Sequence, residues 1–339
     1  MTATSRELVY QTLSFDNPAR APRDLWALPL ATWNYPNEYN ALLRDYPSDL
    51  GSPNGFEREQ PITKGDQFAI GEYTDEWGCT FVNIQAGVIG EVKDALIKDW
   101  NMDTSLVHIP REWLTLSPDE VNRQCAASDK FMIGGPCARP FEQLQFLRGS
   151  ADLYMDLMDP PAGLRAFMHE MHNFYTEMLT AWAKTDIDAI RFMDDWGSQR
   201  VLLIKPALWR EYFKTMYADY AQIARSYGKK IFMHSDGHIL AIYPDLVEIG
   251  MDALNSQIFC MGAANLAPYA GQITFWGEID RQHLLPEGTP NDIDRAVREV
   301  HSMLWKNGGC FAQCEFGAGA KPENVRQVYQ SWDAVTITP

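Results

Sequence analysis

The side chains with the clearest chemical potential in this sequence lie in residues 229–238, KKIFMHSDGH. An apolar run of strand length gives way there to His234 and Asp236. One residue separates these two, so on an extended chain their side chains point to the same side. A histidine and a carboxylate delivered by one strand end can bind a metal ion. The pair would equally suit a buried histidine followed by a helix-capping aspartate, and the pattern alone leaves both interpretations open.

Four other apolar segments end in polar residues in the same way: DAIRFMDDWG, DALNSQI, ITFWGEID and GGCFAQCEFG. Asp195 and Glu278 are the expected acid–base groups, because a carboxylate at a strand end can exchange protons with a ligand. Two adjacent carboxylates cannot both face one small pocket, so one of Asp194 and Asp195 would instead pair with Arg200 or cap a helix. The residues expected to bind substrate are Asp194, Arg200, Asn255, Gln257 and, after the first strand, Trp33.

The last of these segments contains two cysteines, Cys310 and Cys314, and Glu315 follows the second. A thiolate needs a metal or a positive neighbour to be useful at neutral pH. Cys310 is expected to be a small buried residue. Cys314 lies at the strand end and is a candidate metal ligand, although Cys310 and Glu315 remain open as alternatives.

Segments of strand and helix character alternate from residue 119 to the end of the chain. The expected strands are 130–133, 189–193, 230–233, 253–258, 273–276 and 310–313. The expected helices are 120–127, 141–148, 161–184, 206–227, 240–249, 263–269, 290–304 and 322–332. This alternation implies parallel strands joined by right-handed crossovers. With a first strand at 25–30 the count is close to eight. We therefore predict an α/β fold of the (β/α)8 barrel type, whose chemistry gathers at the mouth formed by the strand C-termini.

The N-terminal third is expected to add a cap within one barrel domain that spans residues 1–339. Residues 47–66 are rich in Gly, Pro, Ser and Asn, and short strands are expected at 68–70, 79–84 and 87–91. We assign about 47–110 to this insertion. The loop 47–66 and the turn DEWG at 75–78 are expected to cover the barrel mouth, since such chemistry benefits from the exclusion of water.

The composition of the chain argues against several classes of binding partner and against a disulfide-stabilised fold. The formal charge is −16, and no basic patch offsets it, so nucleic acid and anionic membranes are not expected partners. No apolar run approaches the length of a membrane span, and the first residues show no secretory pattern. Six cysteines in 339 residues are too few for a disulfide framework. A cytoplasmic enzyme fits these features.

Several long motifs, in the expected order, resemble the uroporphyrinogen decarboxylase superfamily over nearly the whole chain. They are RELVYQTLSFDNPARAP, DEWG, DDWGSQRVLLIKPALWREYF, GKKIFMHSDGHILAIYPDLVEIGMDALN, FWGEIDRQHLLPEGTP and KPENVRQVY. The resemblance implies a (β/α)8 barrel. True decarboxylases of the family carry an arginine-rich segment after the first strand, where this chain reads LPLATWNYPNEY. Decarboxylation of a porphyrinogen is therefore not expected.

DEWG and DDWGSQR look like the other branch of the superfamily, whose methyltransferases move methyl groups to or from corrinoid proteins or thiols. Those enzymes bind zinc through His-x-Cys at the central strand and a cysteine on the last strand. Here His234 matches and Asp236 replaces the first cysteine, while Cys314 is placed as the second. The resemblance thus implies a zinc site of His234, Asp236 and Cys314.

The sequence therefore favours a zinc-dependent methyltransferase that moves a methyl group between an O- or N-methylated small molecule and a corrinoid or thiol acceptor. The chain shows no corrinoid-binding segment, so cobalamin is expected on a partner protein, and a homodimer is possible. Two other functions remain open. One is a metal-independent decarboxylase or lyase for a small carboxylic acid, in which Asp195 stabilises a protonated intermediate and Arg200 binds the carboxylate. The other is a barrel that only binds a ligand.

Overall fold

Eight parallel strands form the centre of the computed structural model, which describes residues 3–54 and 62–337. Six strands make one sheet in the order β10-β9-β8-β7-β6-β2, and β1 pairs with β11. Their bounds are β1 Arg23–Ala27, β2 Leu50–Gly51, β6 Phe131–Ala138, β7 Ala189–Met193, β8 Lys230–Ser235, β9 Ala253–Ser256, β10 Thr274–Phe275 and β11 Ala312–Phe316.

Backbone hydrogen bonds at two seams close these strands into a ring. At the first seam, Phe275 of β10 donates to the Gly309 carbonyl at 2.8 Å, and the Phe311 N–H donates to the Phe275 carbonyl at 2.9 Å. At the second, the Asp49 N–H donates to the Arg23 carbonyl at 2.9 Å, which joins β2 to β1. The (β/α)8 barrel expected from the sequence is confirmed.

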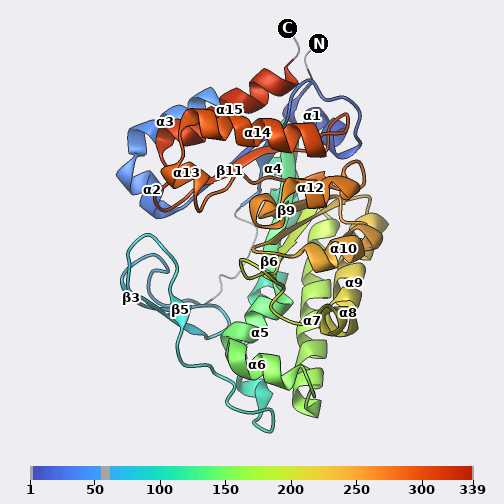
Figure 1. Cartoon of the computed structure of the whole chain (residues 1–339). Coiled ribbons are helices and arrows are strands. Elements are labelled where there is room, and N and C mark those ends of the chain that lie inside the picture. The colour runs from blue at the N-terminus through green and yellow to red at the C-terminus, as the bar shows by residue number, and fades with distance from the viewer. Residues whose placement is uncertain (1–2, 55–61, 338–339) are drawn as a thin grey trace.

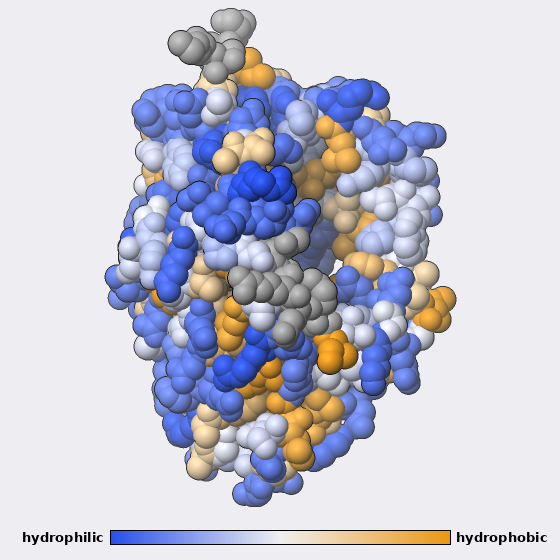
Figure 2. Space-filling model, turned by 180° about the vertical axis from the view of Figure 1, so that it is seen from behind, coloured by the Kyte–Doolittle hydropathy of each residue, from blue (hydrophilic) through white to orange (hydrophobic). Residues whose placement is uncertain are grey.

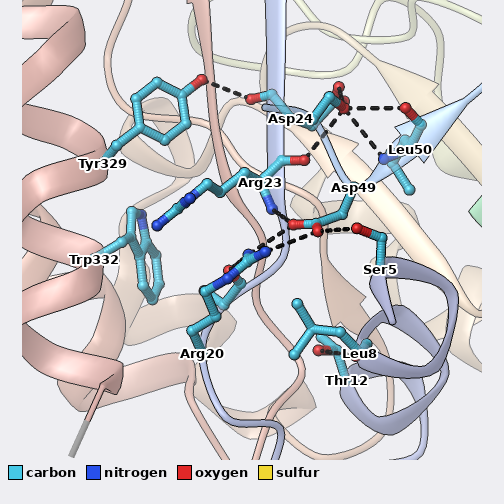
Figure 3. A network of polar contacts seen from close by, with 12 residues as sticks. Ser5, Leu8, Thr12, Arg20, Arg23, Asp24, Asp49, Leu50, Tyr329 and Trp332 are labelled. Atoms are coloured by element: carbon cyan, nitrogen blue, oxygen red, sulfur yellow. Dashed lines mark hydrogen bonds and ion pairs between the residues drawn. The ribbon is translucent and has the colours of Figure 1, made fainter. Parts of the chain in front are cut away.

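The Asp49 carboxylate ties three separate segments together at the second seam (Figure 3). Arg20 donates to its two oxygens at 2.6 and 2.8 Å, the Ser5 hydroxyl donates at 2.6 Å, and the Arg23 N–H donates at 2.7 Å. Asp49 is almost completely buried. A buried carboxylate is tolerated only when such donors satisfy it, so this residue holds the first helix and the first two strands in one arrangement.

Helices follow the strands as crossovers on the outside of the ring (Figure 1). They are α1 Ser5–Leu13, α2 Pro29–Asn34, α3 Pro36–Asp45, α4 Pro118–Ala126, α5 Pro140–Arg148, α6 Ser150–Asp156, α7 Ala162–Ala183, α8 Pro206–Tyr212, α9 Lys214–Ser226, α10 Tyr243–Ile249, α11 Ile258–Met261, α12 Ala263–Leu266, α13 Leu284–Glu287, α14 Pro290–Leu304 and α15 Pro322–Thr336. Many begin with proline, whose missing N–H costs nothing in the first turn. Thr289 also caps α14 by accepting from the Asp292 N–H.

The structure differs from the expected elements in a few places. The helix expected at 206–227 is divided into α8 and α9 at Phe213, and α6 and the two-residue β2 were not anticipated. The first strand ends at Ala27, and Pro29 then begins α2, because proline at the first helical position favours a helix there. Trp33 consequently lies in a helix rather than at a strand end.

Apolar side chains fill the inside of the ring. Residues in or directly beside the strands β6 to β11 form one buried cluster with Val9 and Leu13 of α1, which pack against the N-terminal end of the barrel. The barrel residues of this cluster are Phe131, Ile133, Ala189, Phe232, Ala253, Trp276 and Phe311. This end of the barrel is therefore filled, and polar side chains can gather only at the opposite end.

A small antiparallel sheet, β3 (Gly71–Thr74), β4 (Thr80–Asn83) and β5 (Glu91–Val92), forms the insertion. It lies at the lower left of Figure 1, away from α14 and α15. Trp77 of its turn packs on Phe174 and Tyr175 of α7, and Gly87 closely approaches the backbone of Leu30 in α2. The insertion thus contacts helices that follow strand C-termini. Residues 55–61, within the loop expected to act as a lid, lie outside the described residues.

Hydrophilic residues cover most of the face shown in Figure 2, which is hollowed in its upper half. Within residues 3–54 and 62–337, no helix combines the length and apolar character needed to cross a bilayer.

Candidate functional site

Three side chains, Asp195, His234 and Asp236, converge at the C-terminal ends of β7 and β8. The His234 Nε2 atom lies 3.6 Å from Asp195 Oδ1 and 3.6 Å from Asp236 Oδ1. One potential ligand atom from each residue falls within 4.8 Å of the others. His234 is buried, and both carboxylates are partly exposed. Among the described residues, these three form the group of His, Cys, Asp or Glu side chains whose spacing suits a metal ion.

Strand pairing explains this convergence. In the parallel register, Met193 of β7 lies beside His234 of β8, which lies beside Asn255 of β9. Asp195 follows Met193 by two residues, and Asp236 follows His234 by two. Alternation along each chain therefore turns all of these side chains toward the same side. The sequence prediction that His234 and Asp236 share a side agrees with this geometry.

Asn255 determines which nitrogen of His234 faces the carboxylates. Its Nδ2 donates to the Trp276 carbonyl at 2.5 Å, and a carbonyl can only accept. Its Oδ1 therefore points toward His234 Nδ1, 2.7 Å away, and accepts a hydrogen bond from the Nδ1–H group. With Nδ1 protonated, neutral His234 presents the lone pair of Nε2 to Asp195 and Asp236. Asn255, expected to bind substrate, instead orients the histidine.

Arg281, in the loop after β10, holds three carboxylates around the site. It forms a short ion pair with Asp236 Oδ2, and its Nη1 donates to Glu315 Oε2 at 2.7 Å. Its Nε lies 3.7 Å from Glu278 Oε1. The pairing occupies one oxygen of Asp236 and leaves Oδ1 turned toward His234. Gln257 also holds this segment in place. Its Nε2 lies 3.4 Å from Asp236 Oδ1, and its Oε1 accepts from the Gly237 N–H.

Two buried glutamates border the cluster with altered acidity. Burial raises the pKa of Glu278 to about 8, because Arg281 only partly offsets the loss of solvation. Its Oε2 has no hydrogen-bond partner among the described residues. Burial also raises the pKa of Glu142 to about 7, against the opposing charge of Arg139. Glu278 and Glu142 are thus suited to carry a proton near neutral pH.

Two pockets open at this end of the barrel. One of about 400 Å³ is lined by Trp26, Ala27, Leu28, Cys137, Arg191, Met193, His234 and Glu315. A second of about 200 Å³ has Gln257, Cys260, Glu278 and Arg281 in its wall. His234 therefore borders the larger pocket, while Gln257 and Arg281, the partners of Asp236, border the smaller one.

Cys314, the expected third metal ligand, is not part of this group. Its thiol is fully buried and points to the Tyr329 hydroxyl of α15 at 3.8 Å. Burial raises its pKa to about 12. The neighbouring Glu315 lines the larger pocket, so alternation along β11 turns Cys314 outward to the helix layer. The structure thus differs from the expectation: Asp195, and not Cys314, lies beside His234 and Asp236, while Cys314 packs against α15.

Asp194 also has a structural place rather than a place in the pocket. It is fully buried and accepts from the N–H groups of Phe141 and Glu142 at 2.9 and 2.7 Å, and from the Tyr217 hydroxyl at 2.6 Å. These N–H groups belong to the first turn of α5, where no helical partner exists. Asp194 therefore caps α5, one of the two alternatives that the sequence left open for this pair, and is not free to bind substrate.

Arg200 and Trp33 are both exposed, contrary to their expected contact with substrate. Arg200 lies on the loop after β7 and lines a surface hollow with residues 201–206, His238 and Ala241. Trp33 is 56% exposed on α2. Neither lines the two pockets described above.

Three charged residues of this end of the barrel were not expected from the sequence: Arg281, Glu142 and Arg191. Arg281 stands in the quoted motif FWGEIDRQ, one residue beyond Asp280, so the clustering of charge after that strand was a usable signal. Arg191 lies inside an apolar strand, DAIRFM, where a charged residue is unusual and calls for a partner. Glu142 gave no such signal.

Comparison with known proteins places the chain in a family. The model of "Uroporphyrinogen decarboxylase (URO-D)" matches residues 120–334. A solved methyltransferase from Methanosarcina mazei shares 13% identity at a TM-score of 0.64, with 98% of this chain and 99% of that one covered. A glycosylated endo-β-1,4-xylanase from Gloeophyllum trabeum shares 12% identity at a TM-score of 0.45, covering 93% and 98%. No curated protein matches. The chain belongs to the uroporphyrinogen decarboxylase family.

Proposed function

We propose that this protein is a metal-dependent methyltransferase whose metal is held by Asp195, His234 and Asp236. The observation that carries the proposal is the direction of the His234 Nε2 lone pair. It faces two carboxylate oxygens at 3.6 Å, neither close enough for a hydrogen bond. A cation between the three would satisfy all of them. The named methyltransferase with the same fold supports the choice of methyl transfer.

The three residues fit zinc. Zinc accepts one imidazole nitrogen and carboxylate oxygens, and a catalytic site has three protein ligands with a position left for water or substrate. The Asn255 side-chain oxygen accepts a hydrogen bond from the other ring nitrogen of His234, as is usual for a histidine that binds a metal. When bound, the metal would act as a Lewis acid on the heteroatom that carries the methyl group.

The remaining residues would handle binding and protons. Arg281 keeps Asp236 in place and offsets the charge of the surrounding carboxylates. Glu278, with its pKa raised to about 8 by burial, is protonated at neutral pH and can give that proton to a leaving oxygen or nitrogen. The larger pocket, bordered by His234, offers about 400 Å³ for a small methylated molecule.

The methyl acceptor is proposed to be cobalt of a corrinoid carried by a partner protein, or a thiol. Oxygen-rich ligands make a hard site, which favours activation of an ether oxygen or an amine over a thiol. The donor is therefore proposed to be an O- or N-methylated small molecule.

The alternative of a metal-independent decarboxylase or lyase loses its proposed carboxylate-binding residue, because Arg200 is exposed on the loop after β7. Asp195, which was to stabilise a protonated intermediate, faces His234 instead. Metal content separates the two functions.

The test uses protein purified without chelators. We expect roughly one zinc per chain by elemental analysis, lost in His234→Ala and retained in Cys314→Ala, with both variants folded by circular dichroism. We also expect methyl transfer to cob(I)alamin from a panel of methoxylated aromatic compounds and methylamines, abolished in His234→Ala.

Two results would refute the proposal. Metal-free protein that still transfers the methyl group at the full rate would exclude the Lewis-acid role. Loss of zinc in Cys314→Ala but not in His234→Ala would mean that the ligands are assigned to the wrong residues.

A further inference from the structure

The larger pocket contains a charged residue that the proposed function does not use. Arg191 is the third residue of β7 and lies on the same side of the strand as Met193, the neighbour of His234. Arg191, Met193 and His234 all line this pocket of about 400 Å³. Successive residues on one side of a strand are about 6.6 Å apart, so Arg191 lies that much deeper in the barrel than Met193.

Arg191 has no ion pair with any described residue, and its Nε is buried without a hydrogen-bond partner. Three other arginines with largely buried side chains behave differently. Arg23 pairs with Asp333, Arg148 with Asp156 and Arg281 with Asp236 and Glu315. A buried charge is costly unless it is paired. Arg191 is the exception among these arginines, which indicates that its partner comes from outside the chain.

The acidic groups around Arg191 are already engaged. Asp24 is near enough to act on Arg191 through charge, but its Oδ2 accepts from the indole nitrogens of Trp26 and Trp276, each at 2.9 Å. Glu315, in the wall of the same pocket, accepts from Arg281 at 2.7 Å. The polar neighbour left to the Arg191 guanidinium is the Cys137 thiol, a weak acceptor.

The rest of the pocket is apolar. Trp26, Ala27, Leu28 and Met193 line it, and the Trp26 ring lies 5.0 Å from the His234 ring, centroid to centroid. A ligand that fills this space would present an anionic end to Arg191 and an apolar body to Trp26. Its other end would lie at His234.

We propose that Arg191 binds the carboxylate of the substrate, and that the substrate is a small carboxylic acid with an apolar body and its methylated heteroatom at the far end. The planar guanidinium can donate two parallel hydrogen bonds to a carboxylate. This anchor fixes the position of the reacting end at the Asp195, His234 and Asp236 site. The inference rests on the proposed function only where it calls the bound acid a substrate. The binding of a carboxylate in this pocket does not depend on that function.

Calorimetric titration with 4-methoxybenzoate and its uncharged analogue 4-methoxybenzamide tests the pocket. The unaltered protein should bind the acid at least tenfold more tightly than the amide. Arg191→Met should weaken binding of the acid at least tenfold and leave the amide unchanged, and Arg191→Lys should fall between. Arg200→Met, which removes an exposed arginine on the loop after β7, is the matched control and should bind like the unaltered protein. Zinc content should be the same in all of them.

Equal affinity of the unaltered protein for acid and amide would overturn the inference, and this comparison decides even where Arg191→Met fails to fold. Full affinity of folded Arg191→Met for the acid would overturn it too, as would the absence of any binding of the acid. Arginine-dependent binding of the acid, combined with methyl transfer at the full rate by metal-free protein, would support the carboxylate pocket while it refutes the metal-dependent function.

Discussion

At the scale of single residues, the site depends on the hydrogen bond between His234 and Asn255, a residue that does not itself face the proposed metal position. If the Asn255 amide were turned over, its Oδ1 would face the Trp276 carbonyl oxygen and its Nδ2–H group would face the Nδ1–H group of His234. Asn255 therefore keeps Nδ1 of His234 protonated and Nε2 free. A histidine orientation set in this way costs little at the moment of binding, because the ring is already in place.

Asn255→Ala is expected to weaken zinc binding by about 10- to 100-fold, the range typical for loss of a residue that hydrogen-bonds to a metal ligand. The measurement is competition with a chromophoric chelator. Asn265→Ala is the control, because it removes a similar bond, from Nδ2 to the Met261 carbonyl at 2.9 Å, outside the site. Unchanged affinity in Asn255→Ala would mean that the ring is positioned by packing alone.

Glu278 should make stability depend on pH. Its pKa is raised from about 4.5 to about 8 by burial, so the folded state holds a proton that the unfolded state has lost. The contribution of protonated Glu278 to the free energy of unfolding is fully present below the unfolded-state pKa. It is lost as pH rises toward 8, at up to about 1.4 kcal/mol per pH unit. Between pH 5 and 8, we therefore expect the stability of Glu278→Gln to rise relative to the unaltered protein.

Urea unfolding at several pH values measures this difference. Glu287→Gln, an exposed neighbour on α13, should track the unaltered protein at every pH. A constant gap between Glu278→Gln and the unaltered protein would show that Glu278 keeps an ordinary acidity.

At the scale of elements, the barrel depends on its seams. β2 has only two residues, and its segment is joined to β1 by one backbone hydrogen bond, by the Ser48 hydroxyl and by the Asp49 carboxylate (Figure 3). Hydrogen bonds that link α1, β1 and β2 through one buried group should contribute more than a surface ion pair does.

Asp49→Asn should lower the free energy of unfolding by about 2–3 kcal/mol, because Arg20 is left partly buried without its carboxylate. Asp45→Asn removes a half-exposed pair with Arg326 and should cost less than about 1 kcal/mol. Both values come from chemical denaturation. Similar losses in the two variants would contradict a special role for the seam.

At the scale of the whole molecule, buried residues of the insertion pack on the barrel helices, but its strands differ in burial. Trp77 is buried against Phe174 and Tyr175 of α7, and Phe81 of β4 packs on Phe146 of α5, whereas β3 and β5 have no buried residue. Regions held by few apolar contacts open more readily than the core. The small sheet β3–β5 should therefore loosen without the barrel.

Trp77→Ala is expected to speed amide exchange in β3 and β4 and to leave β7 and β8 protected, with zinc content unchanged. Removing a buried tryptophan typically costs about 3–5 kcal/mol, which here should fall on the insertion. Trp33→Ala, at an exposed position, should change neither region. Equal loss of protection in both regions would show that insertion and barrel unfold as one unit.

The sequence by itself determined the elements and the local arrangement of the central strand end. β7 and α14 have the bounds expected for them, because apolar runs and proline or glycine boundaries are local signals. His234 and Asp236 face the same side for the same reason, since alternation acts over two residues.

Only the tertiary structure decided which distant residues join them. β11 is buried on both faces, so its pattern does not say whether Cys314 or Glu315 faces the pocket, and a shift of one residue exchanges them. The pairing of Arg281 with Asp236, the proton position set by Asn255, and the unpaired charge of Arg191 all depend on the closure of the ring. The contacts of His234 with Asn255 and of Asp236 with Arg281 join residues that are 21 and 45 positions apart in the chain, and periodicity carries no information over such separations.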